Sequence, residues 1–366
     1  MKVLVANLIL FTSETKQIKK VESIKDTMIY NLCLAFKNEG HEVTLAASDL
    51  YKPTKDEDYP FEIAWLKTKY TSIFPANLLP CCPDIKRLVK NGNYDLIISS
   101  EVFSLCSLFI AQTKAKNFII WQELAMHNNA YNGMASKIWY GVISPKAFKN
   151  SVIVPRSEQA KQFISKYVKN VSAEIIDHGI NSDIFKPNTK KENQFSISSQ
   201  LINRKQIDES INAFANYLKK YDNTAKLYIM GEGDQKENLQ SLAKQLGVED
   251  NVIFTGKLAH QELISILKNS KAMLVYTRKD NNMVSIVESI ALATPIITTD
   301  VPYNSSYIKS NKLGIVKSNW NEDDLYEISL RNDKYVNNCL EYRKTLSCEY
   351  KVKQFVDVYN KYLNKN

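Results

Sequence analysis

Residues 272–299, AMLVYTRKDNNMVSIVESIALATPIITT, contain a short apolar run, a polar loop, an amphipathic segment and a second apolar run in direct succession. The runs at 272–276 and 296–299 have the length and composition of strands, and the apolar spacing over 285–293 favours a helix. Strands that alternate with helices form parallel sheets, because each crossover helix returns the chain to the same end of the sheet. The stretch therefore predicts a β-α-β unit.

The same alternation continues along the whole chain and predicts an α/β fold. Further strands are expected at 3–7, 42–47, 95–99, 117–121, 151–155, 174–177, 195–198, 226–230 and 252–255. Helices are expected between them, among others at 26–38, 158–169, 206–220, 236–246 and 261–268. Each half of the chain thus predicts a doubly wound, Rossmann-like domain with a parallel sheet.

The length and a polar break predict two domains. At 366 residues the chain exceeds the size at which single hydrophobic cores stop growing. We expect an N-terminal domain at 1–180, a linker at 181–193, a C-terminal domain at 194–349 and a final helix at 350–366 that packs back on the first domain. Because ligands bind at the carboxyl ends of strands in open α/β sheets, the expected site is a cleft between the domains.

The composition excludes several classes of protein. Apolar residues make up 44% and charged residues 24% of the chain, as in ordinary globular proteins. No apolar run reaches the roughly 20 residues of a membrane span, and no signal peptide is recognised at the start, so a cytoplasmic protein is expected. The six cysteines lack the spacing of a zinc site. The net charge is +9, but the basic residues are spread along the chain and form no continuous block. This distribution favours a phosphate-rich ligand or an anionic membrane over nucleic acid.

The polar loop before the helix expected at Ser285 is the strongest candidate for a ligand site. A helix start directs N–H groups and a partial positive charge at such a loop, which suits a diphosphate. Asp280 and Glu288 would flank it with hydrogen-bond acceptors for ligand hydroxyls. The structural alternative is a capping box, Ser285-x-x-Glu288, in which the glutamate only reaches back to the helix start.

With its surroundings, this segment resembles the retaining glycosyltransferases of family 4, which have the two-domain GT-B fold. That family carries two glutamates eight positions apart and then a Gly-Thr-Pro-type turn. Asp280 stands at the first glutamate position, Glu288 matches the second, and Thr294-Pro295 matches the turn. The resemblance implies that Asp280 contacts the donor sugar and Glu288 the ribose. It also implies that the backbone N–H groups of Met283, Val284 and Ser285 hold the phosphates and that Asn282 lies in the donor site. Asn281-Asn282-Met283 replaces the usual glycines of this loop.

Other segments match the family in the same order. Residues 198–205 resemble the segment whose Arg and Lys clamp the diphosphate; Lys205 matches the lysine, whereas Gln200 stands at the arginine position, so that Arg204 would have to supply this contact. The resemblance further assigns Gly231, Gly233 and Lys257 to the donor pocket. The alternative for Lys205 is a solvated lysine at a helix start, and the alternative for Gly231 and Gly233 is that they only permit the backbone to turn.

The first half matches the family less closely. Residues 16–23, at the place of the glycine-rich first loop, contain no glycine, so acceptor binding is expected to differ from that of better-known members. A family histidine follows the fourth strand near the sugar, and either Glu123 or His127 stands at its place; a hydrogen-bonded loop residue is the alternative for His127. His41 and His178 are interpreted as structural.

The resemblance implies transfer of a sugar from a nucleotide-sugar donor to a glycan or lipid-linked acceptor in cell-surface polysaccharide synthesis. No metal or other cofactor is implied, because Lys205, Arg204 and the helix start would stabilise the leaving diphosphate. Residues 61–79 interleave apolar side chains with lysines, which predicts either contact with an anionic membrane or packing on the first domain. A nucleotide-sugar epimerase of the same fold and a noncatalytic partner of a glycan-assembly complex are the alternative functions.

Overall fold

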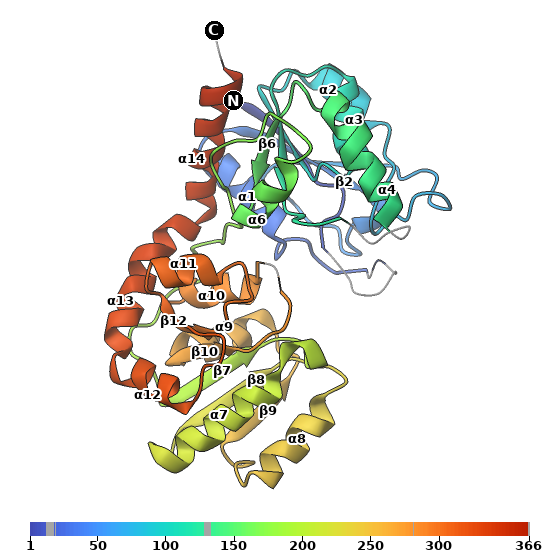
Figure 1. Cartoon of the computed structure of the whole chain (residues 1–366). Helices are drawn as coiled ribbons and strands as arrows, with labels where there is room; N and C mark the ends of the chain where they lie inside the picture. The colour runs from blue at the N-terminus through green and yellow to red at the C-terminus, as the bar shows by residue number, and fades with distance from the viewer. Residues whose placement is uncertain (12–17, 19, 128–132, 281, 365–366) are drawn as a thin grey trace. The chain divides into compact units, whose positions relative to one another are not determined.

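The computed structural model describes residues 1–11, 18, 20–127, 133–280 and 282–364. Figure 1 shows the arrangement of their helices and strands. The chain divides into two compact units. The first comprises Met1–Gly179 together with Cys348–Asn366, and the second comprises Ile180–Ser347. The division therefore falls between Gly179 and Ile180, and the end of the chain belongs to the first unit.

The first unit contains a six-stranded parallel sheet in the order β3-β2-β1-β4-β5-β6. Its strands are β1 (Lys2–Ala6), β2 (Glu42–Ser48), β3 (Glu62–Leu66), β4 (Leu96–Ser100), β5 (Phe118–Gln122) and β6 (Val152–Pro155). Its helices are α1 (Met28–Asn38), α2 (Ile85–Gly92), α3 (Leu105–Gln112), α4 (Met134–Ile138), α5 (Ser144–Ala147), α6 (Glu158–Ile164) and α14 (Cys348–Val358).

Helices cover both faces of this sheet because its central strands are apolar on both sides. In β1, Val3 and Val5 contribute to one buried cluster, and Leu4 and Ala6 contribute to the other. A parallel strand that is buried on both faces reads as a continuous apolar run, which is why β1 is recognisable in the sequence.

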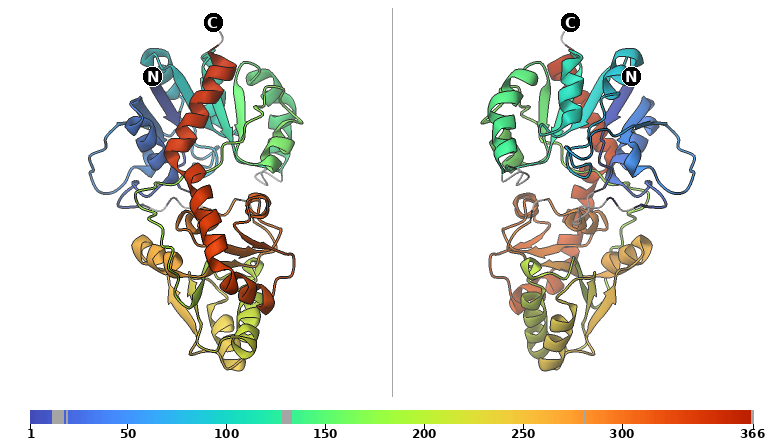
Figure 2. Two further views of the ribbon diagram at one scale, coloured as in Figure 1. Left: turned by 90° about the vertical axis from the view of Figure 1, so that its left-hand side faces the viewer. Right: turned by 90° about the vertical axis from the view of Figure 1, so that its right-hand side faces the viewer.

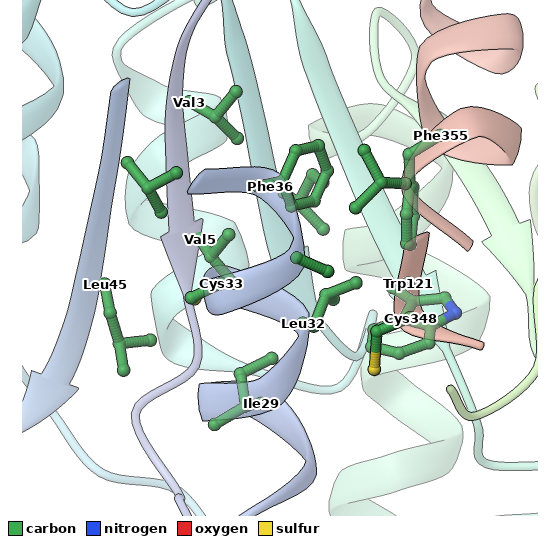
Figure 3. Close-up of a cluster of buried hydrophobic side chains, with 14 of the residues drawn as sticks. Val3, Val5, Ile29, Leu32, Cys33, Phe36, Leu45, Trp121, Cys348 and Phe355 are labelled. Atoms are coloured by element: carbon green, nitrogen blue, oxygen red, sulfur yellow. The ribbon is translucent and has the colours of Figure 1, made fainter. Parts of the chain in front are cut away.

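Helix α14 completes the first cluster, although it follows the whole second unit in the chain. In both views of Figure 2 it lies along the first unit. The Phe355 ring packs edge to face on Trp121, with ring centroids 5.3 Å apart, and also contacts Phe36. Figure 3 shows these rings meeting beside Cys348. The last helix is therefore part of the first core.

The second unit repeats the same topology with the strand order β12-β11-β10-β7-β8-β9. Its strands are β7 (Gln194–Ser198), β8 (Lys226–Met230), β9 (Val252–Gly256), β10 (Ala272–Val275), β11 (Ile296–Thr298) and β12 (Gly314–Val316). Its helices are α7 (Ile207–Lys220), α8 (Lys236–Gln245), α9 (His260–Asn269), α10 (Val284–Ala291), α11 (Ser305–Ser310), α12 (Glu322–Leu330) and α13 (Asn332–Tyr342). The order reverses between β7 and β10, and such a switch point is where ligands bind in doubly wound sheets.

Three sequence predictions differ from the structure. Residues 174–177 form no strand; the Ile176 N–H donates to the Pro155 carbonyl, and the Ile176 carbonyl accepts the Trp121 indole N–H, so the segment is an irregular connection anchored by the buried Ile176. The edge strands β3 and β12 were not among the expected strands. The expected linker at 181–193 packs on the second unit, where Lys191 Nζ donates to Thr294 Oγ1 at 2.9 Å.

The segment 61–79 has its apolar side chains divided between core and surface. Phe61, Leu66 and Leu79 are buried, whereas Tyr70 and Ile73 are exposed. Most of the segment therefore packs on the first sheet, which agrees with the interpretation that it packs on the first domain. Across the described ranges, none of the helices combines the length and the apolar character that crossing a membrane requires.

Candidate functional site

The candidate site lies at the carboxyl ends of β7 and β10, which are neighbours in the second sheet. A short 3₁₀ turn, Asn203–Lys205, follows β7. The loop after β10 leads into α10, whose first residue is Val284 and whose N-cap residue is Met283. The sheet thus brings together two loops that are about 75 residues apart in the chain.

The capping box that was the structural alternative at this helix start is not formed. Because α10 begins at Val284, Ser285 lies inside its first turn, and no side chain caps the helix at Met283. Glu288 points elsewhere: its carboxylate is 3.4 Å from His260 Nε2 at the start of α9. The glutamate is therefore available for a role other than capping, and its position is set by His260, which no sequence motif marks.

Asp280 takes part in three side-chain hydrogen bonds, and two of them join the two loops. Its Oδ2 lies 2.7 Å from Lys205 Nζ and accepts a 2.7 Å bond from Thr277 Oγ1, while its Oδ1 lies 3.0 Å from Arg204 Nη1. The side chains of Lys205 and Asp280 are only 10% and 12% exposed. Lys205 is therefore not a solvated lysine at a helix start, and the structure brings the two expected phosphate-binding cations together on one carboxylate.

Backbone contacts reinforce this connection between the loops. The Arg278 N–H donates to the Arg204 carbonyl at 2.9 Å, and Arg204 Nη1 donates to the Lys279 carbonyl at 2.8 Å. Arg204 thus holds the loop with both its main chain and its guanidinium. Arg204 is therefore the cation beside Lys205, whereas the neutral Gln200, at the position of the family's arginine, is exposed in the preceding loop.

The N–H groups at the start of α10 are not all available to a ligand. The Met283 N–H donates to Asn304 Oδ1 at 2.7 Å, and Asn304 is completely buried. Met283 therefore does not offer the N–H that the resemblance assigned to phosphate. Val284 and Ser285 occupy the first turn, where a helix supplies no carbonyl partner for the N–H groups. Asn282 is half-buried beside them, and Asn281 lies outside the described residues.

The two glycines after β8 have a packing role that explains them without a ligand. A side chain at Gly231 would meet the Ser199 carbonyl oxygen at 1.9 Å, and one at Gly233 would meet the Leu201 carbonyl oxygen at 2.2 Å. The loops after β7 and β8 can approach this closely only because both positions are glycine. Lys257, after β9, is exposed.

Of the two candidates in the first unit, Glu123 stands directly after β5. Its carboxylate lies 2.9 Å from Arg156 Nη1 and 3.5 Å from His178 Nε2. Burial on its own would raise the pKa of Glu123, but the His178 hydrogen bond and the Arg156 charge together lower this pKa to about 2. The guanidinium of Arg156 in turn stacks 3.6 Å above the Trp121 ring. Glu123 is thus a fixed, ionised acceptor at the carboxyl edge of the first sheet.

His127 is held by hydrogen bonds at both ring nitrogens. Its Nδ1 lies 3.2 Å from Ser136 Oγ and its Nε2 lies 3.0 Å from the Tyr167 hydroxyl. The ring also packs edge to face on Tyr140 and Phe163. This environment favours the alternative of a hydrogen-bonded loop residue.

Sequence reasoning missed Glu101, which follows β4 with a left-handed backbone (φ 65°). Its carboxylate accepts the N–H groups of Glu123 at 2.8 Å and Leu124 at 3.3 Å. Burial raises the pKa of Glu101 to about 7, although the Arg156 charge opposes this shift. No motif marks this residue, because its environment forms only when β4 and β5 pair. It positions the loop that carries Glu123.

Comparison with known proteins agrees with this architecture. Residues 180–332 match the family model described as glycosyl transferases group 1. Among curated proteins, the alpha-monoglucosyldiacylglycerol synthase of Streptococcus pneumoniae is 29% identical over 45% of this chain and 41% of its own length. The poly(ribitol-phosphate) alpha-N-acetylglucosaminyltransferase of Staphylococcus aureus is 24% identical over 69% of this chain and 51% of its own length. The chain thus spans about half the length of these relatives.

Solved structures share the fold over nearly the entire chain. HepE from Anabaena, solved in complex with UDP, has a TM-score of 0.68 and 11% identity, with 99% of this chain and 100% of that chain covered. Sucrose-phosphate synthase from Thermosynechococcus elongatus has a TM-score of 0.68 and 15% identity, with 99% of each chain covered. The two Rossmann-like domains have the GT-B arrangement of sheets and helices, which confirms the predicted fold class.

Proposed function

We propose that this protein transfers a sugar from a nucleotide-sugar donor to a saccharide acceptor, with retention at the anomeric carbon and without a metal. The match of residues 180–332 to the family model of group 1 glycosyl transferases supports this proposal. The observation that carries the proposal is that Lys205 and Arg204 share the Asp280 carboxylate just before α10, and that Lys205 lines one small pocket together with Met283, the N-cap residue of α10. Two cations and a helix start at one point suit a diphosphate.

In this proposal the second unit binds the donor. The diphosphate lies against the N–H groups of Val284 and Ser285, and Lys205 and Arg204 turn from Asp280 to its oxygens. Glu288 accepts a hydrogen bond from the ribose, with His260 holding its carboxylate in place. Asp280, once it no longer bonds both cations, is free to accept from a hydroxyl of the donor sugar.

The chemical step needs positioning and charge stabilisation more than a protein nucleophile. The bond between the anomeric carbon and the phosphate oxygen breaks, and the acceptor oxygen bonds to the same face of that carbon. The acceptor proton passes to the departing phosphate oxygen. Lys205 and Arg204 stabilise the negative charge that develops on the diphosphate, and fixed charges of this kind make a large contribution to catalysis.

The relatives support a choice of donor and acceptor classes. A uridine diphosphate sugar is the first donor to test, because the similar HepE structure contains UDP. The relatives are named for the synthesis of a glucosyldiacylglycerol and for the transfer of N-acetylglucosamine to poly(ribitol-phosphate), which supports a cell-surface glycan or a lipid-linked saccharide as the acceptor. We assign the acceptor to the first unit, where Glu123 stands at the carboxyl edge of the sheet.

Calorimetric titration with UDP tests the proposal. Wild-type protein should bind UDP equally well with and without EDTA, and Lys205→Ala should weaken binding by about tenfold or more, since a charge-assisted hydrogen bond contributes roughly 1.5–3 kcal/mol. Lys219→Ala, which removes an exposed lysine from α7, is the matched control. Equal affinities for Lys205→Ala and the control would refute the donor site.

Incubation with a UDP-sugar separates the alternatives. A transferase consumes the donor only slowly without an acceptor, whereas an epimerase converts the donor alone. A noncatalytic partner subunit would leave the donor unchanged even with a saccharide acceptor present.

A further inference from the structure

The helical segment 134–147 exposes a row of large apolar side chains. It consists of α4, a π-helical turn at Trp139–Ile143 and α5, and Figure 1 shows α4 on the outer side of the first unit. Met134, Ile138 and Val142 are 62%, 52% and 55% exposed. Their spacing of four residues places them along one face of the helix.

The opposite face fixes this segment on the first unit. Trp139, Tyr140 and Phe148 are buried, and Trp139 Nε1 donates to the Val102 carbonyl at 2.7 Å. The ring of Phe103 packs edge to face on Trp139. The segment therefore packs on the core with its aromatic face, and the exposed apolar row lies on the opposite face.

Positive charge surrounds the apolar row. Lys137, Lys146 and Lys149 are exposed on the same segment and its immediate continuation. The sequence contains no aspartate or glutamate between Glu123 and Glu158. Elsewhere the chain mixes both signs of charge, with 48 basic and 39 acidic residues overall. An acid-free stretch of this length with exposed apolar side chains is thus a local feature and not a consequence of composition.

We propose that this face, formed by Met134, Lys137, Ile138, Val142, Lys146 and Lys149 and called here the α4–α5 face, binds an anionic membrane surface. The three apolar side chains enter the boundary between headgroups and acyl chains, and the lysines contact lipid phosphates. Apolar residues with flanking lysines are typical of helices that lie in the membrane interface. The proposal does not depend on the transferase activity, because lipid binding is measured without donor or acceptor.

The charge pattern favours lipid over the other occupants of such a face. Lysine is depleted at protein–protein interfaces, and a second copy of the chain would bring its own lysines against these. An anionic lipid surface neutralises each lysine and at the same time removes the apolar side chains from water.

Flotation with vesicles tests the proposal. The protein should float with vesicles of phosphatidylcholine mixed with phosphatidylglycerol, and remain in solution with vesicles of phosphatidylcholine alone. Ile138→Ser should weaken binding about fivefold, as expected for withdrawing one partly buried apolar side chain. Replacing Lys146 by alanine should weaken it by a similar factor, since one basic residue near such a surface contributes about 1 kcal/mol.

The matched controls lie in the second unit. Leu330→Ser removes an apolar side chain that is 69% exposed on α12, and Lys219→Ala removes an exposed lysine from α7. Thermal unfolding of all variants verifies that they fold. The proposal is overturned if the wild-type protein does not float with anionic vesicles. It is likewise overturned if Ile138→Ser floats with them to the same extent as Leu330→Ser. It is also overturned if the protein dimerises without lipid and Ile138→Ser abolishes the dimer, because the face would then bind a second copy.

Discussion

Lys205 Nζ lies 2.7 Å from Asp280 Oδ2, so the lysine proposed to bind donor phosphate already has a carboxylate partner within the same unit. Arg204 shares that partner at 3.0 Å. If the diphosphate binds as proposed, it competes with the Asp280 carboxylate for the same two cations. The proposal therefore predicts that the aspartate, which replaces the glutamate expected by family resemblance, determines donor affinity.

Asp280→Asn should bind UDP more tightly than wild type and yet transfer sugar more slowly. Removing the negative charge releases both cations for the diphosphate, and we expect a gain in affinity of about fivefold, or about 1 kcal/mol. Turnover should fall, because the asparagine accepts a hydrogen bond from the sugar less strongly than a carboxylate. Asp250→Asn, at an exposed position after α8, controls for the change in net charge. Weaker UDP binding by Asp280→Asn would mean that the carboxylate orients the cations instead of competing for them.

Glu288→Gln should lose nucleotide affinity without losing stability. Helix α10 begins at Val284, and Glu288 does not cap it, so the melting temperature should change no more than in the exposed control Glu237→Gln. UDP affinity should fall by about tenfold, because a charge-assisted hydrogen bond to the ribose is lost.

A nucleotide without ribose hydroxyls locates the partner of Glu288. Wild-type protein should bind 2′,3′-dideoxyuridine diphosphate more weakly than UDP, whereas Glu288→Gln should distinguish the two much less. If the preference for UDP is the same in both proteins, Glu288 does not contact the ribose.

Gly231→Ala should destabilise the second unit strongly. The residue has φ 146°, and its new Cβ would lie 1.9 Å from the Ser199 carbonyl oxygen, which is backbone and has little room to move. We expect a loss of about 2–4 kcal/mol in the free energy of unfolding. In Gly141→Ala the added Cβ meets no atom within 4 Å, so this helical position should gain up to about 1 kcal/mol. Chemical denaturation measures both, and similar values for the two variants would contradict the packing role of Gly231.

The sequence predicts local elements well and the relationships between them less well. The apolar runs of β10 and β11 and the helical period of α10 are each visible within a few residues. Strand β12 spans only Gly314–Val316, too short for any period to be recognised. The pairing of Lys205 with Asp280 spans 75 positions and depends on β7 lying beside β10. The partners of Glu288 and of the Met283 N–H, His260 and Asn304, are likewise set by tertiary packing and carry no motif of their own.

The contribution of Glu101 to the stability of the first unit should decrease as pH rises from about 4.5 to about 7. Burial raises the pKa of this carboxyl to about 7 from 4.5, so in that range the folded state holds a proton that the unfolded state has released. More protons bound in the folded state mean that stability decreases with pH, here by a total of about 3 kcal/mol for the group. Glu101→Gln should therefore be more stable than wild type at pH 8 and similar to it at pH 4.5.

Urea denaturation across this pH range measures the effect, with the exposed Glu158→Gln as control. Asp177 has a raised pKa as well, because it is buried, and it contributes with the same sign in both proteins. The difference between wild type and Glu101→Gln therefore isolates the glutamate. Glu123 does not titrate in this range, because its pKa is about 2. Its ion pair with Arg156 is lost only in acid, when the carboxylate is protonated. Parallel stability curves for wild type and Glu101→Gln between pH 4.5 and 8 would show that the carboxyl is ionised at no cost, and that the loop carrying Glu123 is held by its charge.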